Sequence, residues 1–204
     1  MKNFTISGLF LLLTASFFTA SAQVKHLVYN AFQTDVEHVI MDYPNSFQHF
    51  IGEELVKNPQ STDYSSLLKI RGSEDCRITK YPSVKKNFYS FQSVLLTAEE
   101  FETAKEKFHS YYNQLAGLSV RFANQTLRLK GEYEAPDDSK KFTSVLFATS
   151  GDGDFSKKLK VELLMEYVLM EWKVKLLIYE KEREDDELPA VSSKYLFSFF
   201  INLH

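Results

Sequence analysis

Residues 158–181, KLKVELLMEYVLMEWKVKLLIYEK, form the longest apolar-rich stretch outside the N-terminus, and their structure decides the fold. A membrane-spanning helix is excluded, because a charged side chain near the bilayer centre costs roughly 3 kcal/mol and charged residues stand inside the stretch at 162, 166, 171, 173 and 175. A soluble helix is excluded as well. At about 100° per residue, charges at 158, 162, 166 and 173 fall on one side and those at 160, 171 and 175 nearly opposite, so no polar face forms.

The stretch instead alternates with a period of two, which is typical of β-strands. Odd positions are apolar from Leu159 to Leu169, and even positions are apolar from Val168 to Ile178. One change of parity indicates a bulge in one strand or a hairpin. A single strand of this length would be roughly 80 Å long, too long for a domain of this size. The sequence therefore predicts a hairpin.

The predicted hairpin has Leu169-Met170 as a two-residue loop. Because this loop lacks the Gly, Asn or Asp that such turns favour, a longer loop from Val168 to Glu171 is the alternative. The two-residue loop sets the register, and each apolar or opposite-charge pair adds roughly 0.2–1 kcal/mol. The predicted pairs are Tyr167 with Trp172, Met165 with Val174, Leu163 with Leu176, Val161 with Ile178 and, on the other face, Glu166 with Lys173.

The clearest helix is predicted over 97–117. Thr97 and Glu100 have the spacing of a capping box, and Gly117 stands where a helix C-terminus is expected. Apolar residues recur at helical spacing, which predicts a core-facing stripe rather than a ligand site. The stripe consists of Phe101, Ala104, Phe108, Tyr111 and Leu115.

The first half of the chain predicts an interrupted helix and three strands. Helical spacing runs over 34–56, with a break at Pro44 and a restart near Asn45. The composition of 58–63 is that of a loop. Strands are predicted at 66–71, 76–81 and 87–96, the first two forming a hairpin around Gly72.

Two further strands, 126–134 and 141–149, precede the 158–181 hairpin. The fold class is therefore α+β, with helices packed on an antiparallel sheet. The C-terminal half is one helix followed by a four-strand antiparallel meander. Over about 97–181 this order resembles the cystatin-like and NTF2-like folds, and the resemblance implies that the helix packs against the meander.

The first 22 residues have the plan of a secretory signal peptide: Lys2, an apolar stretch from Leu9 to Phe18, and small residues at 20–22. The apolar stretch is short of the roughly 20 residues that a membrane anchor needs. We expect cleavage before Gln23 and an exported protein, periplasmic or secreted. Cleavage leaves 182 of the 204 residues, enough for one domain with a real core.

The expected organisation is a signal peptide at 1–22, a single α+β domain at 23–187 and an apolar C-terminal tail at 188–204. Residues 180–187, EKEREDDE, are a solvated charged segment. The stretch 194–204, KYLFSFFINLH, is too short to span a membrane, so no transmembrane span is expected in the mature chain. The tail is expected to dock on the domain, to add a strand to an exposed edge or to be disordered, and association through 194–204 is one of its predicted roles.

Charge disfavours one class of partner, and the cysteine content excludes an internal disulfide. The formal charge is −3 and becomes −4 once Lys2 is removed, which disfavours nucleic acid as a partner because that needs clustered Lys and Arg. Cys76 is the only cysteine, so an intramolecular disulfide is impossible. We interpret Cys76 as a small apolar strand residue.

The ionisable residues do not form a recognisable catalytic or metal motif. Asp152-Gly153-Asp154 with Ser156 is similar to the start of a calcium loop, but the positions that require Gly and Glu hold Lys157 and Leu163. His38 and Asp42 share a helix face, with no third ligand, and His26, His49, His109 and His204 stand alone. The carboxylate pairs 53–54, 99–100 and 137–138 are adjacent, and adjacent helix residues do not face each other.

No catalytic, cofactor-binding or metal-binding residue is therefore assigned, and no cofactor is expected. The sequence favours an exported non-enzymatic module that binds a protein or an apolar ligand through the sheet or the sheet–helix groove. Two alternatives remain: an envelope-associated partner protein that uses its C-terminal tail, and a small enzyme with a dispersed site. An exposed apolar patch over a sealed core would favour binding, whereas ionisable groups buried in a cleft would favour an enzyme.

Overall fold

The computed structural model describes residues 20–84, 86–122, 125–150 and 154–180. Nine antiparallel strands form one sheet in the order β1-β2-β3-β4-β9-β8-β7-β6-β5. The helical elements are α2 (Ala20–Asp42), the 3-10 turn η2 (Tyr43–Asn45), α3 (Phe101–Ala116) and α4 (Asp154–Lys158). The strands are β1 (Ile51–Lys57), β2 (Thr62–Ser66), β3 (Asp75–Tyr81), β4 (Phe88–Ala98), β5 (Ser119–Phe122), β6 (Gln125–Lys130), β7 (Phe142–Ser150), β8 (Leu159–Val168) and β9 (Glu171–Glu180).

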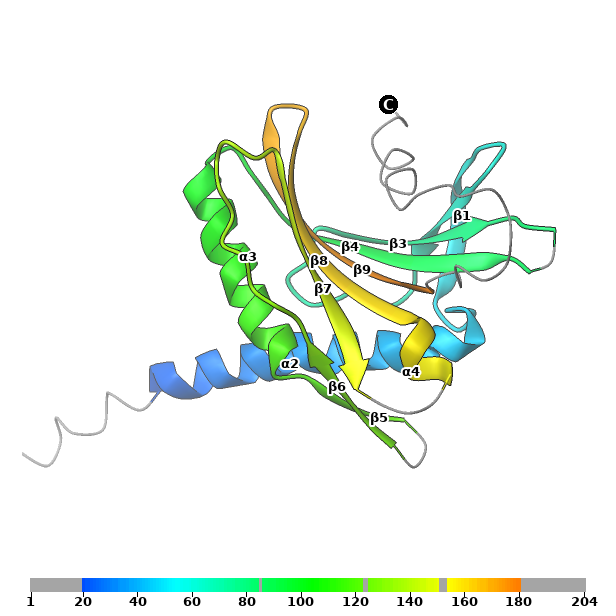
Figure 1. Cartoon of the computed structure of the whole chain (residues 1–204), viewed down its shortest axis with the longest axis horizontal. Coiled ribbons are helices and arrows are strands. Elements are labelled where there is room, and N and C mark those ends of the chain that lie inside the picture. The colour runs from blue at the N-terminus through cyan, green and yellow to red at the C-terminus, as the bar shows by residue number, and fades with distance from the viewer. Residues whose placement is uncertain (1–19, 85, 123–124, 151–153, 181–204) are drawn as a thin grey trace, which may run out of the picture.

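The predicted α+β class is confirmed, and the helices pack on the sheet. Figure 1 shows α3 running alongside the long central strands and α2 crossing near β5. The rings of Phe32 on α2 and Tyr111 on α3 lie 5.0 Å apart and join the two helices. No helix in the described part of the chain is long and apolar enough to cross a membrane. Residues 1–19 and 181–204 lie outside the described residues, and so do most of the predicted signal peptide and the whole tail.

The predicted hairpin of 158–181 is confirmed in every pair of its register. β8 and β9 pair Tyr167 with Trp172 and Glu166 with Lys173, and the pairing runs on to Leu159 opposite Glu180. The loop is the two-residue one rather than the longer alternative. Leu169 and Met170 both have positive φ, 55° and 67°, which a two-residue turn needs to match the twist of the strands.

The charge pairing predicted across this hairpin is wrong in one detail. Glu166 lies opposite Lys173 in the register, but its carboxylate binds the ammonium of Lys175, with Oε1 and Nζ 2.5 Å apart. Lys173 instead lies 3.8 Å from Glu171 on its own strand. Long lysine side chains reach diagonal neighbours in a sheet, so the residue directly opposite is not the necessary partner.

Helix α3 and its apolar stripe are confirmed, but the predicted capping box is wrong. The helix begins at Phe101, and the side chain of its N-cap residue, Glu100, makes no capping hydrogen bond to the helix backbone. Thr97 belongs to β4, where its backbone N–H and its hydroxyl both donate to the carboxylate of Glu74. Gly117 does end the helix, with an ordinary φ of −92° rather than a left-handed one.

The predicted helix restart after Pro44 is also wrong. α2 ends at Asp42, η2 follows, and the backbone then turns through Ser46 and Phe47, both with positive φ. Phe47 is fully buried, and its ring packs 6.2 Å from that of Phe91. This anchor reverses the chain, and 51–57 becomes an edge strand paired with β2.

The predicted strand at 66–71 is displaced. The strand that pairs with β3 is β2, four residues earlier, so the predicted loop at 58–63 is shorter than expected. Residues 67–74 form the loop between β2 and β3, and Arg71 binds this loop to α2. The strands predicted at 76–81 and 87–96 are confirmed as β3 and β4.

Five strands follow α3, so the predicted arrangement of a helix and four strands is not confirmed, and neither is the cystatin-like or NTF2-like order. The additional strand is β5, only four residues long, too short for a period of two to stand out. β6 ends at Lys130 instead of 134. At Gly131 a Cβ would lie 2.7 Å from Cγ1 of Val145, and the hydroxyl of Tyr112 donates to the Gly131 carbonyl. The chain therefore leaves the sheet there to pack on α3.

The core lies between the sheet and the two long helices. Alternate residues of β8 and β9 enter it, among them Leu163 and Val174. Leu164 and Leu177 are buried too, but on the opposite face of the sheet and outside this core cluster. The side chains between the two long helices and the sheet form a packed core. Binding through the sheet or the sheet–helix groove stays a prediction.

The hairpin tip as a candidate interaction site

The tip of the β8–β9 hairpin exposes two large apolar side chains. Leu169 is 68% exposed and Met170 is 80% exposed, at the outer end of two long central strands of the sheet (Figure 1). Single exposed apolar residues are common on soluble proteins. Here two consecutive ones occupy the two positions of a tight turn, so neither can fold back onto the strands. We name this pair, Leu169 and Met170, the tip.

The base of the tip is an aromatic cluster on the core side of the hairpin. Tyr167 and Trp172 face each other across the strands with ring centroids 5.0 Å apart. Phe101, at the start of α3, meets the Trp172 ring edge-on at 5.1 Å. Trp172 is only 4% exposed, as the predicted apolar even face of β9 requires. The tip therefore stands on residues that are fixed by the core.

Lys141 completes the base. Its ammonium lies 4.3 Å from the ring centroid of Tyr167 and 5.7 Å from that of Trp172. Its carbonyl accepts a hydrogen bond from the backbone N–H of Tyr167 at 2.9 Å. A cation over an aromatic face contributes roughly 0.5–1 kcal/mol at exposed sites. The segment before β7 is thereby attached to the hairpin one residue below the turn.

The other side of the hairpin carries charges. Glu171 directly follows the tip, and its side chain is partly exposed beside Lys173. One step further along the strands, the Glu166–Lys175 pair is mostly buried. Deeper on the same face, the hydroxyl of Tyr179 donates to Glu162 at 3.0 Å.

The surroundings of Tyr179 suit a structural contact rather than acid–base chemistry. Burial of the ring and the neighbouring Glu162 carboxylate both raise the pKa of Tyr179 far above its ordinary value. A phenol with so high a pKa stays protonated at neutral pH and donates its hydrogen bond. The two side chains thus form one partly buried hydrogen bond on the sheet.

Asp42 is paired with His49, which was predicted to stand alone, rather than with His38 on its own helix face. His38 is exposed, whereas buried Asp42 accepts hydrogen bonds from the ring of His49 at 2.5 Å and from the amide of Asn45 at 2.9 Å. The backbone N–H of His49 donates to the same carboxylate. Asp42 therefore holds the turn that leads into β1, which is a structural role.

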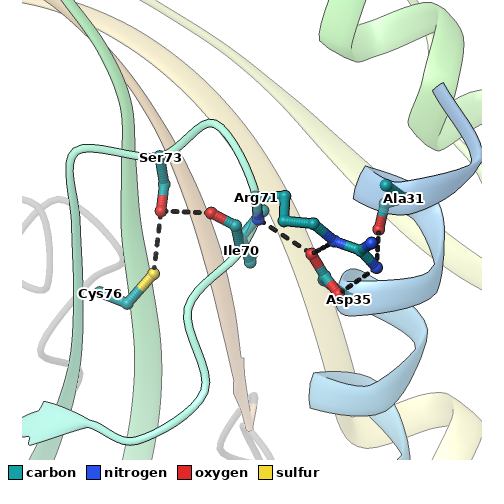
Figure 2. A network of polar contacts seen from close by, with 6 residues as sticks. All are labelled: Ala31, Asp35, Ile70, Arg71, Ser73 and Cys76. Carbon is teal, nitrogen blue, oxygen red and sulfur yellow. Dashed lines mark hydrogen bonds and ion pairs between the residues drawn. The ribbon is translucent and has the colours of Figure 1, made fainter. Parts of the chain in front are cut away.

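Cys76 is buried, as predicted, within a small polar network (Figure 2). Its sulfur lies 3.3 Å from the hydroxyl of Ser73 and 3.4 Å from that of Ser93. The Ser73 hydroxyl donates to the carbonyl of Ile70 at 2.6 Å. These contacts fasten the 67–74 loop to β3.

Figure 2 also shows how that loop is fastened to α2. Arg71 donates three hydrogen bonds to the carboxylate of Asp35: two from guanidinium nitrogens, at 2.9 and 3.0 Å, and one from its backbone N–H, at 2.9 Å. Burial alone would raise the pKa of Asp35. The hydrogen bonds and charge of Arg71 outweigh it and hold that pKa below its usual value. Asp35 is therefore ionised at neutral pH and serves as an anchor.

The remaining candidate residues do not converge on a site. Residues 152 and 153 of the calcium-like stretch lie outside the described residues, and Ser156 is buried with its carbonyl accepting from Thr149. His109 is exposed beside Asn113 and Tyr133. Within the described ranges no group of three His, Cys, Asp or Glu residues could hold a metal ion. The carboxylate pairs at 53–54, 99–100 and 137–138 are all exposed.

A shallow groove of about 370 Å³ opens at the end of α3, lined by 116–119 and 128–130. Arg128 and Lys130 are its charged residues, and no carboxylate or histidine stands opposite them in the lining. The residues that line the groove can make polar contacts with a ligand, but they provide no acid–base pair.

The sequence placed Leu169 and Met170 at the loop of a hairpin, yet it did not mark them as a site. One feature of the sequence could have marked them. A two-residue hairpin loop needs positive φ at both positions and favours Gly, Asn or Asp there, and this loop has none of these residues. No family model, no curated protein and no solved structure matches this chain.

Proposed function

We propose that the protein is an exported, non-enzymatic binding module that docks on its partner through the tip of the β8–β9 hairpin. The observation that carries the proposal is the exposure of Leu169 and Met170 on a base fixed by the core. The proposed class of function is the predicted one, but the proposed binding surface is the hairpin end instead of the sheet or the sheet–helix groove.

The tip can supply useful binding energy. Burying a Leu or Met side chain contributes roughly 1.5–3 kcal/mol relative to leaving it in water. Interfaces commonly depend on a few such central residues surrounded by weaker contacts. Tyr167 and Lys141 lie directly behind the tip, where they would form part of the rim of the interface.

The arrangement of the ionisable groups supports a binding role. Glu162, Glu166 and Asp35 each have a partner that fixes a strand or a loop. General acid–base catalysis needs a group held within reach of a reacting atom in a cleft. Instead, Glu162 and Glu166 bind side chains on β9, and Asp35 binds Arg71 in the 67–74 loop.

The docking proposal is tested by a crosslink followed by a titration. A photoreactive residue replaces Met170 in the full chain, expressed in its native host. A matched variant carries it at Leu67, which is 70% exposed and lies in another loop. A protein crosslinked from 170 and not from 67 is then purified. It is titrated with the parent chain and with Leu169→Asn/Met170→Gly.

We expect the double substitution to weaken binding by at least about 100-fold, since two buried anchors are lost. Leu67→Ser should leave the affinity unchanged. Equal affinity of the parent chain and the double variant would refute docking through the tip, and so would crosslinking that does not depend on position.

The export part of the proposal has its own measurement. Intact mass of the protein recovered outside the cytoplasm should correspond to a chain that starts at Gln23. Exported protein that still carries residues 1–22 would contradict it.

The alternative role of the tail is tested by deletion. Removing 189–204 should leave the domain folded, because α3 and the sheet already share a core. If the tail associates with other molecules, the deletion changes the oligomeric state or envelope retention, measured by light scattering and fractionation. A truncated chain that cannot fold would make the tail structural. No change in either measurement would remove the envelope-associated alternative.

A further inference from the structure

The tip is strained as well as exposed. Leu169 and Met170 have φ of 55° and 67°, in the left-handed region where Cβ crowds the following carbonyl oxygen. For ordinary residues this conformation lowers the folded population by roughly 5- to 30-fold per residue. Asn-Gly would form the same turn with far less strain.

The paired strands hold the strained turn, and with it the two side chains, in one arrangement. The strands below the turn pair without interruption up to Val168 and Glu171. The backbone bond from Tyr167 to Lys141 and the burial of Trp172 fix the base. A two-residue loop closed on such a base has little freedom to rearrange, so the tip is presented in its final shape before any partner arrives.

We infer that the strained turn pre-organises Leu169 and Met170 for a shaped apolar pocket in a partner protein. The inference rests on the proposed docking function and specifies its partner. Pre-organisation raises affinity by removing the ordering cost of the bound conformation, and strained residues cluster at ligand clamps for this reason.

A lipid surface fits the tip less well than a protein pocket. A bilayer is fluid and gains nothing from a fixed geometry of two side chains. Glu171 follows Met170 directly and is partly exposed, and insertion of the tip would draw this carboxylate toward the hydrocarbon at considerable cost. At the rim of a protein pocket the same carboxylate stays in water.

The test separates shape from apolarity. One variant inserts Gly-Gly between Leu169 and Met170, which retains both side chains but frees the backbone. The other is Leu169→Asn/Met170→Gly, which retains the turn but removes the apolar side chains. Both are titrated with the protein crosslinked at position 170 and are melted thermally. All three chains are also sedimented with phosphatidylcholine–phosphatidylglycerol vesicles.

The expected pattern has three parts. The Asn-Gly variant melts about 3–8 °C higher than the parent chain, because strain is relieved, and loses binding at least about 100-fold. The Gly-Gly variant loses binding about 10- to 100-fold although it keeps Leu and Met. None of the three chains sediments with the vesicles. Emission from Trp172, the only tryptophan, reports whether each hairpin base has stayed folded.

Each contrary result has a distinct meaning. Parent-like affinity of the Gly-Gly variant refutes pre-organisation and leaves tip docking intact. Parent-like affinity of the Asn-Gly variant refutes both. If the melting temperature of the Asn-Gly variant does not rise, the turn is not strained. If the parent and Gly-Gly chains both bind the vesicles, the partner is a membrane and not a protein pocket. If the insertion unfolds the base, the variant Met170→Gly is measured instead. It should melt at a higher temperature than the parent chain and bind at least tenfold more weakly. The inference is refuted if either result is not obtained.

Discussion

Replacing Trp172 by alanine probes the base of the hairpin directly. The indole is 4% exposed and sits where three parts of the chain meet. Phe101 brings the start of α3 to it, and Tyr167 brings the facing strand, each with its ring about 5 Å away. The ammonium of Lys141 approaches the same ring from the segment before β7.

The expected loss of stability follows from these contacts. Truncating a buried Trp to Ala generally costs about 3–5 kcal/mol, through lost transfer energy and the cavity left behind. The two aromatic contacts are worth roughly 0.5–1.5 kcal/mol each beyond their buried area, and the cation–ring contact adds less. Because these ring contacts are lost in addition to the buried area, we expect a loss near the upper end of that range, about 4–5 kcal/mol. Partial relaxation of Tyr167 into the space keeps the loss from exceeding it.

Urea unfolding followed by far-UV circular dichroism measures this loss, because the variant has no tryptophan to report on folding. Trp172→Phe is the matched control, and it should cost less than half as much because it retains a ring against Phe101. A loss below about 1 kcal/mol for Trp172→Ala would reject a core role for this face of β9, and with it the rigid base on which the tip stands.

Two further predictions concern ion pairs. A double-mutant cycle on Glu166 and Lys175 should give a coupling energy of about 1–3 kcal/mol, since the pair is mostly buried. The cycle on Glu166 and Lys173 should give less than about 1 kcal/mol. Equal coupling energies would contradict this geometry. The Asp35–Arg71 anchor should make stability depend on acid pH. The pKa of Asp35 is lower folded than unfolded, so its contribution is complete above the unfolded value of 3.8 and disappears as the pH falls through the folded value. Urea melts between pH 2 and 6 should show a smaller loss on acidification for Asp35→Asn than for the parent chain, and parallel losses would argue against the anchor.

The hairpin was predictable because its signal is local and long. Ten residues on each strand repeat with a period of two, and a one-residue slip would move every apolar side chain to the other face. Only one register places Val161 to Tyr167 against their apolar partners. The same reasoning located α3, whose stripe repeats over four turns.

The first half of the chain was not predictable in this way, because distant contacts override its local pattern. The stretch IGEELVK, 51–57, has no clear alternation, and it is a strand only because it pairs with β2 at the edge of the sheet. The turn before it depends on Phe47 reaching Phe91, 44 positions away. His49 reaches Asp42 through that same turn, whereas helical spacing placed only His38 on the same face as Asp42.

The strength of the register and the strain of the turn are connected. Ten paired positions along β8 and β9, at roughly 0.2–1 kcal/mol each, can offset the roughly 1–2 kcal/mol that each left-handed residue costs. A short or irregular hairpin, such as β1–β2 with its register shifts, would respond to the same two residues by slipping or by opening a longer loop. Leu169 and Met170 therefore retain their strained conformation because the ladder below them has no alternative register of similar energy. If the ladder is shortened from its far end, the turn should be the first part of the hairpin to relax, and any partner that depends on its shape should be lost before the fold is.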